Sequence, residues 1–124
     1  MALRISIIIG STRPNRFSEK PAQWLFEEAK KFPGIEVELL DLRDYPMPFY
    51  DQPRSPSGVT DGQYGNDIAN KWAAKIGAAD AFIIIGPEYN HGYSAVLKNA
   101  FDFIYREWNN KPVGFVSYGS VGGA

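Results

Sequence analysis

Apolar residues near the N-terminus follow two patterns, a continuous run and then a helical repeat. The run from Arg4 to Ile9 is short, rich in β-branched side chains and closed by Gly10, which is typical of a central strand buried on both faces. The next segment predicts a helix, because Ser18 can cap it and apolar residues recur at helical spacing. These residues are Ala22, Leu25, Phe26 and Ala29, and the helix is expected to end near residues 32–34.

A second strand and helix follow. Ile35–Leu42 alternates between apolar side chains on one face and Glu36 and Glu38 on the other, which fits an edge strand better than a central one. Asp67–Ile76 returns to helical spacing, and Gly77 is placed as its C-cap.

The remaining pattern completes an α/β chain. Ala81–Ile85 reads as a buried strand, Ser94–Tyr105 as a helix and Pro112–Tyr118 as a fourth strand. Alternating strands and helices predict a parallel sheet with right-handed crossovers and helices on both faces, formed by a single domain over residues 1–124. The chain stops after a glycine-rich turn, where a helix should begin. Part of the sheet is therefore expected to lack its cover.

Composition and charge limit the classes of partner that the protein is expected to bind. With 124 residues, 44% of them hydrophobic, the chain can bury the core of one domain. A formal net charge of -1 gives no electrostatic case for nucleic acid or an anionic membrane surface, since both require clustered positive charge. We therefore expect neither partner.

The absence of cysteine also limits the chemistry. The sequence has no cysteine, which excludes disulfides, thiol nucleophiles and thiolate metal sites, so any redox reaction must use a bound cofactor. No apolar run approaches the roughly 20 residues that span a bilayer, and the N-terminus enters a strand without a charged leader. We expect a cytoplasmic protein without a metal site.

Residues 44–65 interrupt the regular pattern. Proline, glycine, serine and aspartate dominate this segment, together with Tyr45, Phe49 and Tyr50. A long irregular segment in a compact domain is usually a functional loop or a mobile one, and the sequence leaves both open. The aromatic side chains here and at Tyr105–Trp108 suggest an interface, with packing of Trp108 on its own domain as the alternative.

The loop at residues 10–18, GSTRPNRFS, joins the first strand to the first helix. Backbone N–H groups at a helix N-terminus favour an anion, and the side chains of Ser11, Arg13, Arg16 and Ser18 would add hydroxyl donors and positive charge. The dinucleotide fingerprint and the P-loop lysine pattern are both absent. The loop predicts a phosphate site rather than a Mg-nucleotide hydrolase, with an ordinary polar turn as an equal alternative.

Two more loops leave the same edge of the predicted sheet. Residues 86–90, GPEYN, supply backbone donors, an aromatic ring and a side-chain amide, while residues 117–123 are rich in glycine and allow backbone to approach a planar ligand. A lone histidine in a loop is more often a spacer than a base, so we assign His91 no catalytic role. Packing is the alternative for Tyr89 and Tyr93. Loops after strands one, three and four together are more specific than each alone.

These three loops carry a family resemblance. GSTRPNRFS at 10–18, GPEYNHGYSAVLKNAFDFI at 86–104 and KPVGFVSYGSVGG at 111–123 resemble the NADPH-dependent FMN reductase family of flavodoxin-like proteins, which includes quinone, azo and chromate reductases. The resemblance extends over essentially the whole chain, and its middle motif is the most specific. It implies a flavodoxin-like open parallel sheet whose strand order in this chain is 2-1-3-4.

The resemblance also implies a flavin site without a catalytic acid or base. In this family the first loop binds the flavin phosphate, the second contacts the isoalloxazine and ribityl groups, and the third approaches the ring from the other side. The residues implied here are Ser11, Arg13, Arg16, Phe17 and Ser18 in the first loop, Pro87, Glu88, Tyr89 and Asn90 in the second, and Ser117, Tyr118 and Gly119 in the third.

The activity implied is hydride transfer from NADPH or NADH through bound FMN to a small-molecule acceptor. A quinone, an azo compound, a free flavin or a metal oxyanion would serve as that acceptor. A flavodoxin-type electron carrier, or a flavin-binding module without turnover, is the alternative. The balance of 13 basic to 14 acidic residues does not suggest the acidic docking surface of such a carrier.

The chain departs from the family pattern at its C-terminus. Family members resemble a five-stranded sheet of order 2-1-3-4-5, and the fifth strand and last helices are absent here. We expect a C-terminally incomplete flavodoxin-like domain, either as part of a longer polypeptide or as a genuine fragment. The resemblance further implies a homodimer or homotetramer.

Overall fold

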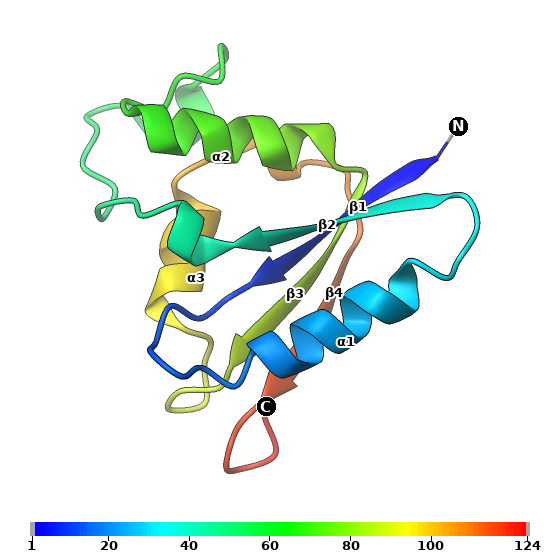
Figure 1. Cartoon of the computed structure of the whole chain (residues 1–124). Helices are drawn as coiled ribbons and strands as arrows, with labels where there is room; N and C mark the ends of the chain where they lie inside the picture. Colours follow the sequence, from blue (N-terminus) through cyan, green and yellow to red (C-terminus); the bar gives the residue numbers. More distant parts are fainter. Residues whose placement is uncertain (1, 124) are drawn as a thin grey trace.

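The computed structural model of the protein describes residues 2–123, and its centre is a four-stranded parallel sheet (Figure 1). The strands are β1 (Leu3–Ile9), β2 (Ile35–Asp41), β3 (Ala81–Pro87) and β4 (Val113–Tyr118), in the spatial order β2-β1-β3-β4. The predicted order 2-1-3-4 is therefore confirmed, with β1 central and β2 at an edge. Ile7 of β1 lies opposite Leu39 of β2 and Ile83 of β3.

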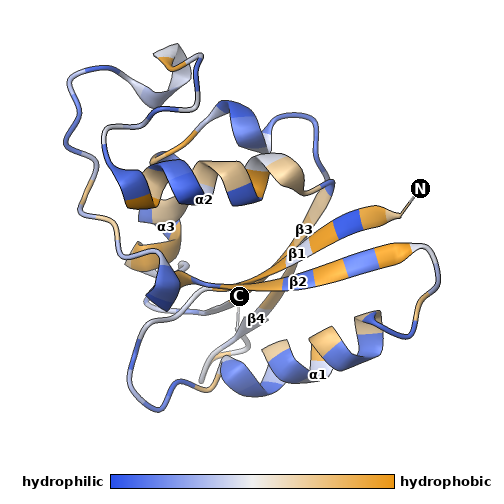
Figure 2. Ribbon diagram, turned by 45° about the horizontal axis from the view of Figure 1, so that its top comes forward, coloured by the Kyte–Doolittle hydropathy of each residue, from blue (hydrophilic) through white to orange (hydrophobic). Residues whose placement is uncertain are grey.

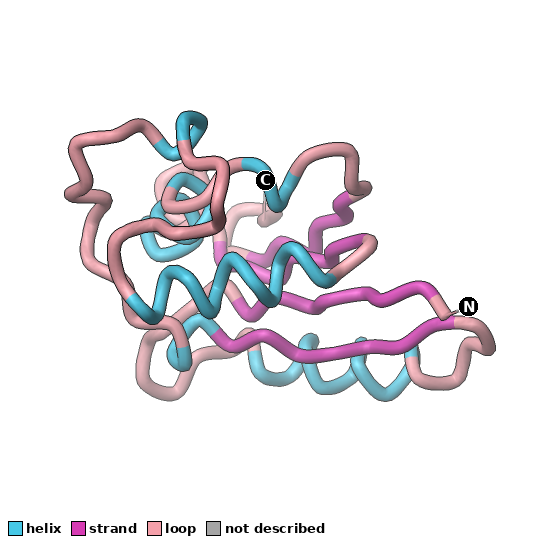
Figure 3. Tube along the Cα trace, turned by 90° about the horizontal axis from the view of Figure 1, so that it is seen from above, coloured by secondary structure: helices cyan, strands magenta, loops and turns pink. Residues whose placement is uncertain are grey.

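Three helices cover the two faces of the sheet. Helix α1 (Glu19–Ala29) lies on one face, and α2 (Asp67–Ala78) and α3 (Ala95–Asp102) lie on the other (Figures 1 and 3). Short 3₁₀ turns occur at Leu42–Asp44, Pro56–Gly58 and Arg106–Trp108. Within the described residues, no helix is both long and apolar enough to cross a bilayer.

The two faces have separate apolar cores. Figure 2 shows apolar residues along α2 and α3. The larger core on this side of the sheet contains Trp72 and Phe103, both fully buried. The smaller core under α1 is formed by Ile7, Ile9, Ala22 and Ile85. This arrangement follows from the sequence, because a strand covered on both faces needs apolar residues at successive positions.

Three local predictions are wrong. Gly77 lies inside α2 rather than at its C-cap: the helix runs to Ala78, and Lys111 Nζ bonds to the carbonyl oxygens of Ile76 and Gly77 at 3.0 Å each. Helix α3 ends at Asp102 rather than at residue 105, although Phe103 and Ile104 beyond it are still buried in the core. Ser18 occupies the N-cap position of α1 without capping it, since its backbone is already helical at φ −56° and ψ −24°.

The irregular segment at 44–65 is anchored to the larger core. Val59 and Tyr64 are buried, and the Tyr50 ring packs on Phe103 with a centroid distance of 4.9 Å. The Tyr64 hydroxyl donates to Glu107 Oε1 at 2.7 Å, and burial together with this bond raises the pKa of Tyr64 to about 12. These contacts hold the segment at several points along its length.

Trp108 packs within its own domain. Its ring contacts those of Trp72, Phe82 and Phe101 at centroid distances of 6.1, 5.0 and 5.6 Å, and its indole N–H donates to the Phe101 carbonyl oxygen. The ring therefore packs between β3 and α2, as the packing alternative expects. A role of Trp108 in an interface stays a prediction.

The outer strand β4 carries the exposed part of the sheet. Phe115 is 67% exposed and Val113 is 49% exposed, on the face that α2 and α3 cover elsewhere. Within residues 2–123, these two side chains of β4 are therefore open to solvent.

Candidate functional site

Three loops converge at the carboxyl end of the sheet (Figure 1). The β1–α1 loop is joined to the other elements by the Gly10 N–H, which donates to the Ile85 carbonyl at 2.7 Å, and by the Gly10 carbonyl, which accepts from Ser94 Oγ at 2.7 Å. The Glu88 N–H donates to the Tyr118 carbonyl at 2.7 Å, which joins the second loop to the third. The convergence expected from parallel strand ends is therefore present.

Close packing beneath the loops depends on two residues without side chains. A Cβ atom on Gly10 would lie 2.5 Å from Leu97 Cδ1 and 2.8 Å from the Ile85 carbonyl oxygen, and one on Gly86 would lie 2.7 Å from the same Leu97 atom. Leu97 is buried in the larger core. The glycines thus let the N-terminal turn of α3 approach both strand ends.

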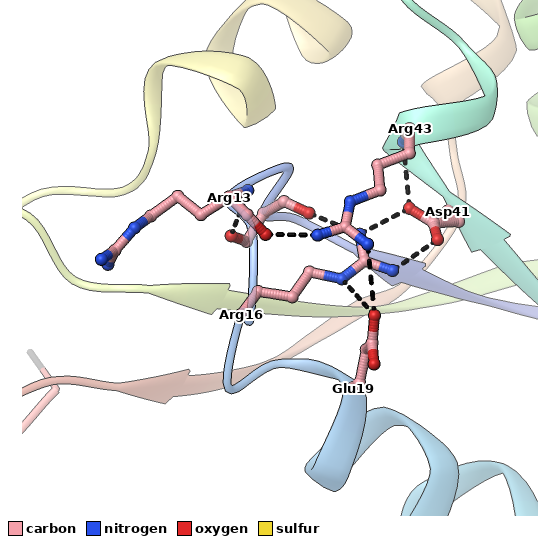
Figure 4. Close-up of polar contacts among 6 residues, drawn as sticks. Arg13, Arg16, Glu19, Asp41 and Arg43 are labelled. Carbon is pink, nitrogen blue, oxygen red and sulfur yellow. Dashed lines mark hydrogen bonds and ion pairs between the residues drawn. The ribbon is translucent and has the colours of Figure 1, made fainter.

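A cluster of charges surrounds the buried side chain of Arg16 in the loop at 10–18 (Figure 4). The Arg16 guanidinium, only 3% exposed, donates to the two carboxylate oxygens of Asp41 at 2.7 and 2.5 Å, to Glu19 at 3.1 Å and to the Ser11 carbonyl at 2.7 Å. Arg43 donates to Glu19 at 3.3 Å and to the Arg13 carbonyl. Arg16 is thus engaged by its own chain.

The pKa values of this cluster follow its contacts. The bond to Asp41 raises the pKa of Arg16 despite the opposing effect of burial. Partial burial acts to raise the pKa of the Asp41 carboxyl, but the bonds from Arg16 and from the Arg43 backbone N–H outweigh it, so this pKa is lowered. Both groups are therefore held in their charged forms.

Arg13 differs from Arg16 in its surroundings. Its side chain is exposed and forms no ion pair with any residue of the 2–123 range, while the neighbouring Tyr89 hydroxyl raises its pKa. Figure 4 shows the Arg13 side chain directed away from the Arg16 cluster. Arg13 therefore presents its positive charge to solvent at the meeting of the first two loops.

Two serines of this loop are buried. Ser11 is 3% exposed, and its Oγ accepts from the Arg13 N–H at 3.4 Å. Ser18 is completely buried, and its Oγ has no hydrogen-bond partner within the described part of the chain. A buried hydroxyl without a partner is costly, so its presence at a helix N-terminus fits a group that accepts a hydrogen bond.

A hollow lies between the first and second loops. Its volume is about 310 Å³, and its lining residues are Ser11, Thr12, Arg13, Tyr89, Ser94, Ala95 and Val96. A hydroxyl, a guanidinium and a phenol thus face a space of ligand size. This donor set fits the phosphate and part of the chain of FMN.

The second loop is built around a tight turn. Tyr89 and Gly92 exchange backbone hydrogen bonds of 2.8 and 3.0 Å, and the residues between them, Asn90 and His91, have φ values of 53° and 63°. Positive φ at both central positions is typical of a type I′ turn. Glu88 Oε2 accepts from the His91 N–H at 2.8 Å, so both residues have structural contacts.

The third loop meets the other two through rings and backbone. The Phe17 and Tyr118 rings lie edge to face with centroids 5.0 Å apart, and Ser117 Oγ donates to the Gly123 carbonyl. A Cβ atom at Gly119 would lie 2.5 Å from Glu88 Oε1. Gly119 therefore allows the Glu88 side chain to pass close to the third loop.

The predicted residues fall into groups. Ser11, Arg13 and Tyr89 line the hollow at the junction of the first two loops, and Ser18 is buried at the start of α1. Glu88, Tyr118 and Gly119 join the second loop to the third, with Phe17 at their edge. Pro87 is buried at the end of β3, and Asn90 and Ser117 are exposed. Arg16 lies apart, because its guanidinium binds carboxylates instead of facing the hollow.

The sequence alone did not identify five residues that line the site or hold its loops in place: Thr12, Glu19, Asp41, Arg43 and Ser94. A signal existed for Asp41, which ends the strand beside β1 and must therefore lie near the first loop. Nothing local identified Ser94 as a bridge to Gly10, 84 positions away. No cluster of three metal-ligating side chains occurs among residues 2–123.

The fold defines a flavodoxin-like α/β protein, and the loop after its first strand carries two buried serines and an exposed arginine. Residues 3–124 match the family described as NADPH-dependent FMN reductase. The chain therefore belongs to this family.

Several curated relatives are similar over nearly the whole chain. An NAD(P)H-dependent FMN reductase of Schizosaccharomyces pombe is 41% identical over 97% of the chain and 60% of its own length. An FMN-dependent NADPH-azoreductase of Staphylococcus aureus is 35% identical over 94% and 60%, and a 2-hydroxy-1,4-benzoquinone reductase of a Burkholderia species is 30% identical over 100% and 66%. The chain thus spans about 60% of the length of the first of these relatives.

A solved structure supports the fold. FerB of Paracoccus denitrificans, a flavoenzyme NAD(P)H:(acceptor) oxidoreductase, superposes with a TM-score of 0.71 over 95% of this chain and 60% of its own. Its sequence identity is 23%, so the likeness concerns the fold alone.

Proposed function

We propose that the protein is an FMN-dependent NAD(P)H oxidoreductase that reduces a small-molecule acceptor. The observation that carries this proposal is the pairing of a buried, unpartnered Ser18 hydroxyl with the exposed cation of Arg13 on one loop. Together with the hollow that Arg13 lines, these groups suit a phosphate attached to a larger ligand. Membership of the family indicates that this phosphate-bearing ligand is FMN.

Each loop has a proposed task. Ser11, Arg13 and Ser18 would hold the phosphate, while Pro87, Glu88, Tyr89 and Asn90 would contact the ribityl and ring. Ser117, Tyr118 and Gly119 would approach the ring from its other side. The chemistry that FMN supplies when bound is the acceptance of a hydride from NADPH or NADH and the delivery of two electrons to the acceptor.

The protein's own contribution is binding and orientation. The tight turn at Asn90 and His91 fixes the second loop, and the bond between the Glu88 N–H and the Tyr118 carbonyl fixes its distance from the third. No side chain is proposed as an acid or base, because the cofactor would supply the redox chemistry and Glu88 Oε2 already accepts from the His91 N–H. Activity would thus depend on the positions of these loops.

The acceptor that we propose is a quinone or an azo compound, with a free flavin or a metal oxyanion also within the implied class. Two relatives support this choice, since one reduces a hydroxybenzoquinone and another is an azoreductase. Steady oxidation of NADPH with a quinone or an azo dye would support turnover. Flavin binding without steady oxidation of NADPH or NADH would instead indicate an electron carrier or a binding module.

The experiment that tests the phosphate site is a comparison of two flavins. We expect Arg13→Ala to weaken FMN binding about tenfold and to change riboflavin binding little, because riboflavin lacks the phosphate. Flavin fluorescence titration measures both affinities. Arg4→Ala is the matched control, since it removes the same charge at the opposite end of β1. Equal losses for FMN and riboflavin would remove Arg13 from the phosphate site.

We also propose a homodimer or homotetramer in the cytoplasm. Exposed aromatic side chains in the 44–65 segment support an interface, above all Phe49 at 80% exposure. Sedimentation of the flavin-loaded protein measures the assembly, and a monomer at about tens of micromolar would contradict it, because interfaces of standard size persist at that concentration.

A further inference from the structure

The strongest unexplained feature is the charge cluster behind the first loop. Arg16 and Arg43 are opposed by Asp41 and Glu19, so the four formal charges sum to zero. The Arg16 guanidinium makes four hydrogen bonds within the protein and is almost completely buried. A group held in this way is not available as a ligand for a phosphate on the other side of the loop.

The cluster acts on the loop through carbonyl groups. The Arg16 guanidinium donates a hydrogen bond to the Ser11 carbonyl at 2.7 Å, and the Arg43 guanidinium donates one to the Arg13 carbonyl (Figure 4). In a trans peptide the carbonyl and the next N–H point in opposite directions, and the bond between Ser11 and Thr12 is trans. Drawing the Ser11 carbonyl toward Arg16 therefore turns the Thr12 N–H away from the cluster, and Thr12 lines the hollow.

The same geometry controls the local charge. The partially negative oxygens of Ser11 and Arg13 are held against the guanidinium groups of Arg16 and Arg43. Carbonyl oxygens that faced the hollow would repel an anion, whereas backbone N–H groups attract it. The cluster thus favours an anion without supplying the charge itself.

We propose that Asp41 and Arg16 form a positioning clamp that orients the backbone of residues 11–13 and thereby gives the site its preference for phosphorylated over unphosphorylated flavin. This inference rests on the proposed flavin function. Arg16 and Asp41 are positioning residues, and Arg13 with the loop N–H groups makes the phosphate contacts. The clamp joins the end of β2 to the first loop through a bidentate pair that lysine cannot reproduce.

The sign of the effect of Asp41→Asn distinguishes this proposal from direct binding by Arg16. If Arg16 were a phosphate ligand restrained by Asp41, removing the carboxylate charge would release a cation and tighten FMN binding or leave it unchanged. For a clamp, the same change loosens the loop and weakens FMN binding, by about tenfold if one oriented hydrogen bond to the phosphate is lost. Riboflavin affinity should change less than about twofold, because its contacts lie in the other loops.

The experiment measures FMN and riboflavin affinities of the full chain by fluorescence titration at a temperature below unfolding. Glu38→Gln is the matched control, since Glu38 is also a β2 carboxylate paired with a cation but lies in an exposed pair with Lys75. Arg16→Lys retains the charge but not the bidentate pair with Asp41, so it should lose FMN affinity as Asp41→Asn does. Equal losses for both flavins, or unchanged or tighter FMN binding, would overturn the clamp.

A second measurement does not require flavin. Hydrogen exchange followed by mass spectrometry reports the protection of residues 10–18 in the ligand-free protein. We expect faster exchange there in Asp41→Asn than in Glu38→Gln, and equal exchange would overturn the positioning role. If the unmodified protein binds neither flavin while this difference persists, the flavin function fails and the structural part of the clamp survives.

Discussion

The substitution Gly10→Ala tests whether the approach of α3 to the first strand depends on a missing side chain. Gly10 lies where β1 passes into the first loop, and its carbonyl accepts the Ser94 hydroxyl that also receives the Leu97 N–H at 3.3 Å. Its φ is not in the left-handed region, so alanine suits the backbone. Any loss of stability must therefore come from lack of space.

The magnitude follows from the contacts of the added methyl group. It would lie 2.5 and 2.6 Å from two carbon atoms of Leu97 and 2.8 Å from the Ile85 carbonyl oxygen. Leu97 is 2% exposed and cannot turn into solvent, while the Ile85 oxygen belongs to the backbone of β3. Overpacking of a core typically destabilises a protein by about 1–3 kcal/mol. Because neither Leu97 nor the Ile85 carbonyl can move away, we expect Gly10→Ala to lower the free energy of unfolding by about 3 kcal/mol.

Thermal unfolding followed by circular dichroism measures this loss. At about 2–8 °C per kcal/mol for domains of this size range, Tm should fall by roughly 10 °C. Gly114→Ala is the matched control, because a Cβ atom there has no heavy atom within 4 Å and it too is a strand glycine. Its effect should stay within about 0.5 kcal/mol.

Gly86→Ala should destabilise the protein by an intermediate amount. Its Cβ would meet only the end of the Leu97 side chain, at 2.7 Å, and no backbone atom within the same range. The expected order of destabilisation is Gly10→Ala, then Gly86→Ala, then Gly114→Ala. A Gly10→Ala protein as stable as Gly114→Ala would refute the argument that Leu97 fixes α3 against the strand ends.

Two further predictions concern pH and burial. The folded-state pKa of Asp41 is lowered, so its contribution to stability is complete above the unfolded pKa of about 3.9 and is lost as pH falls through the folded value. The stability difference between the unmodified protein and Asp41→Asn should shrink in acid, and urea titrations at pH 7 and pH 3 that gave the same difference would contradict this. The pKa of Tyr64 is raised to about 12, so its contribution is complete below about pH 10 and is lost above it. Tyr64→Phe should lower the free energy of unfolding by about 1–2 kcal/mol at neutral pH, because Glu107 and the Tyr105 N–H lose their partner, and an unchanged urea midpoint would refute it.

The order of elements was predictable because burial leaves a direct pattern in the sequence. The central strands are apolar at successive positions, as in Ile7–Ile9 and Ile83–Ile85, since both faces are covered. The alternation in β2 likewise marked an edge, because only part of its surface is buried. Parallel pairing then followed from the helices between the strands.

Helix ends were less predictable because distant residues determine them. The apolar spacing of α3 continues through Phe103 and Ile104, which are buried although the helix has ended. At the end of α2, Lys111 satisfies two carbonyl groups from 34 and 35 positions away, so no glycine cap is needed at Gly77. Burial can be predicted from the local sequence, but the distant side chain that supplies a hydrogen bond cannot.

The same limit explains why the two arginines of the first loop could not be separated from sequence. Both follow the same strand, and both are cations near a helix N-terminus. A buried guanidinium needs a carboxylate partner, whereas an exposed one does not. Asp41 at the end of the neighbouring strand pairs with Arg16, while Arg13 stays exposed. Counting cations in the loop therefore overstates the charge that a phosphate would meet. The affinity of such a loop depends on which of its cations are already neutralised, and here that is decided by β2, a strand that contributes nothing to the lining of the hollow.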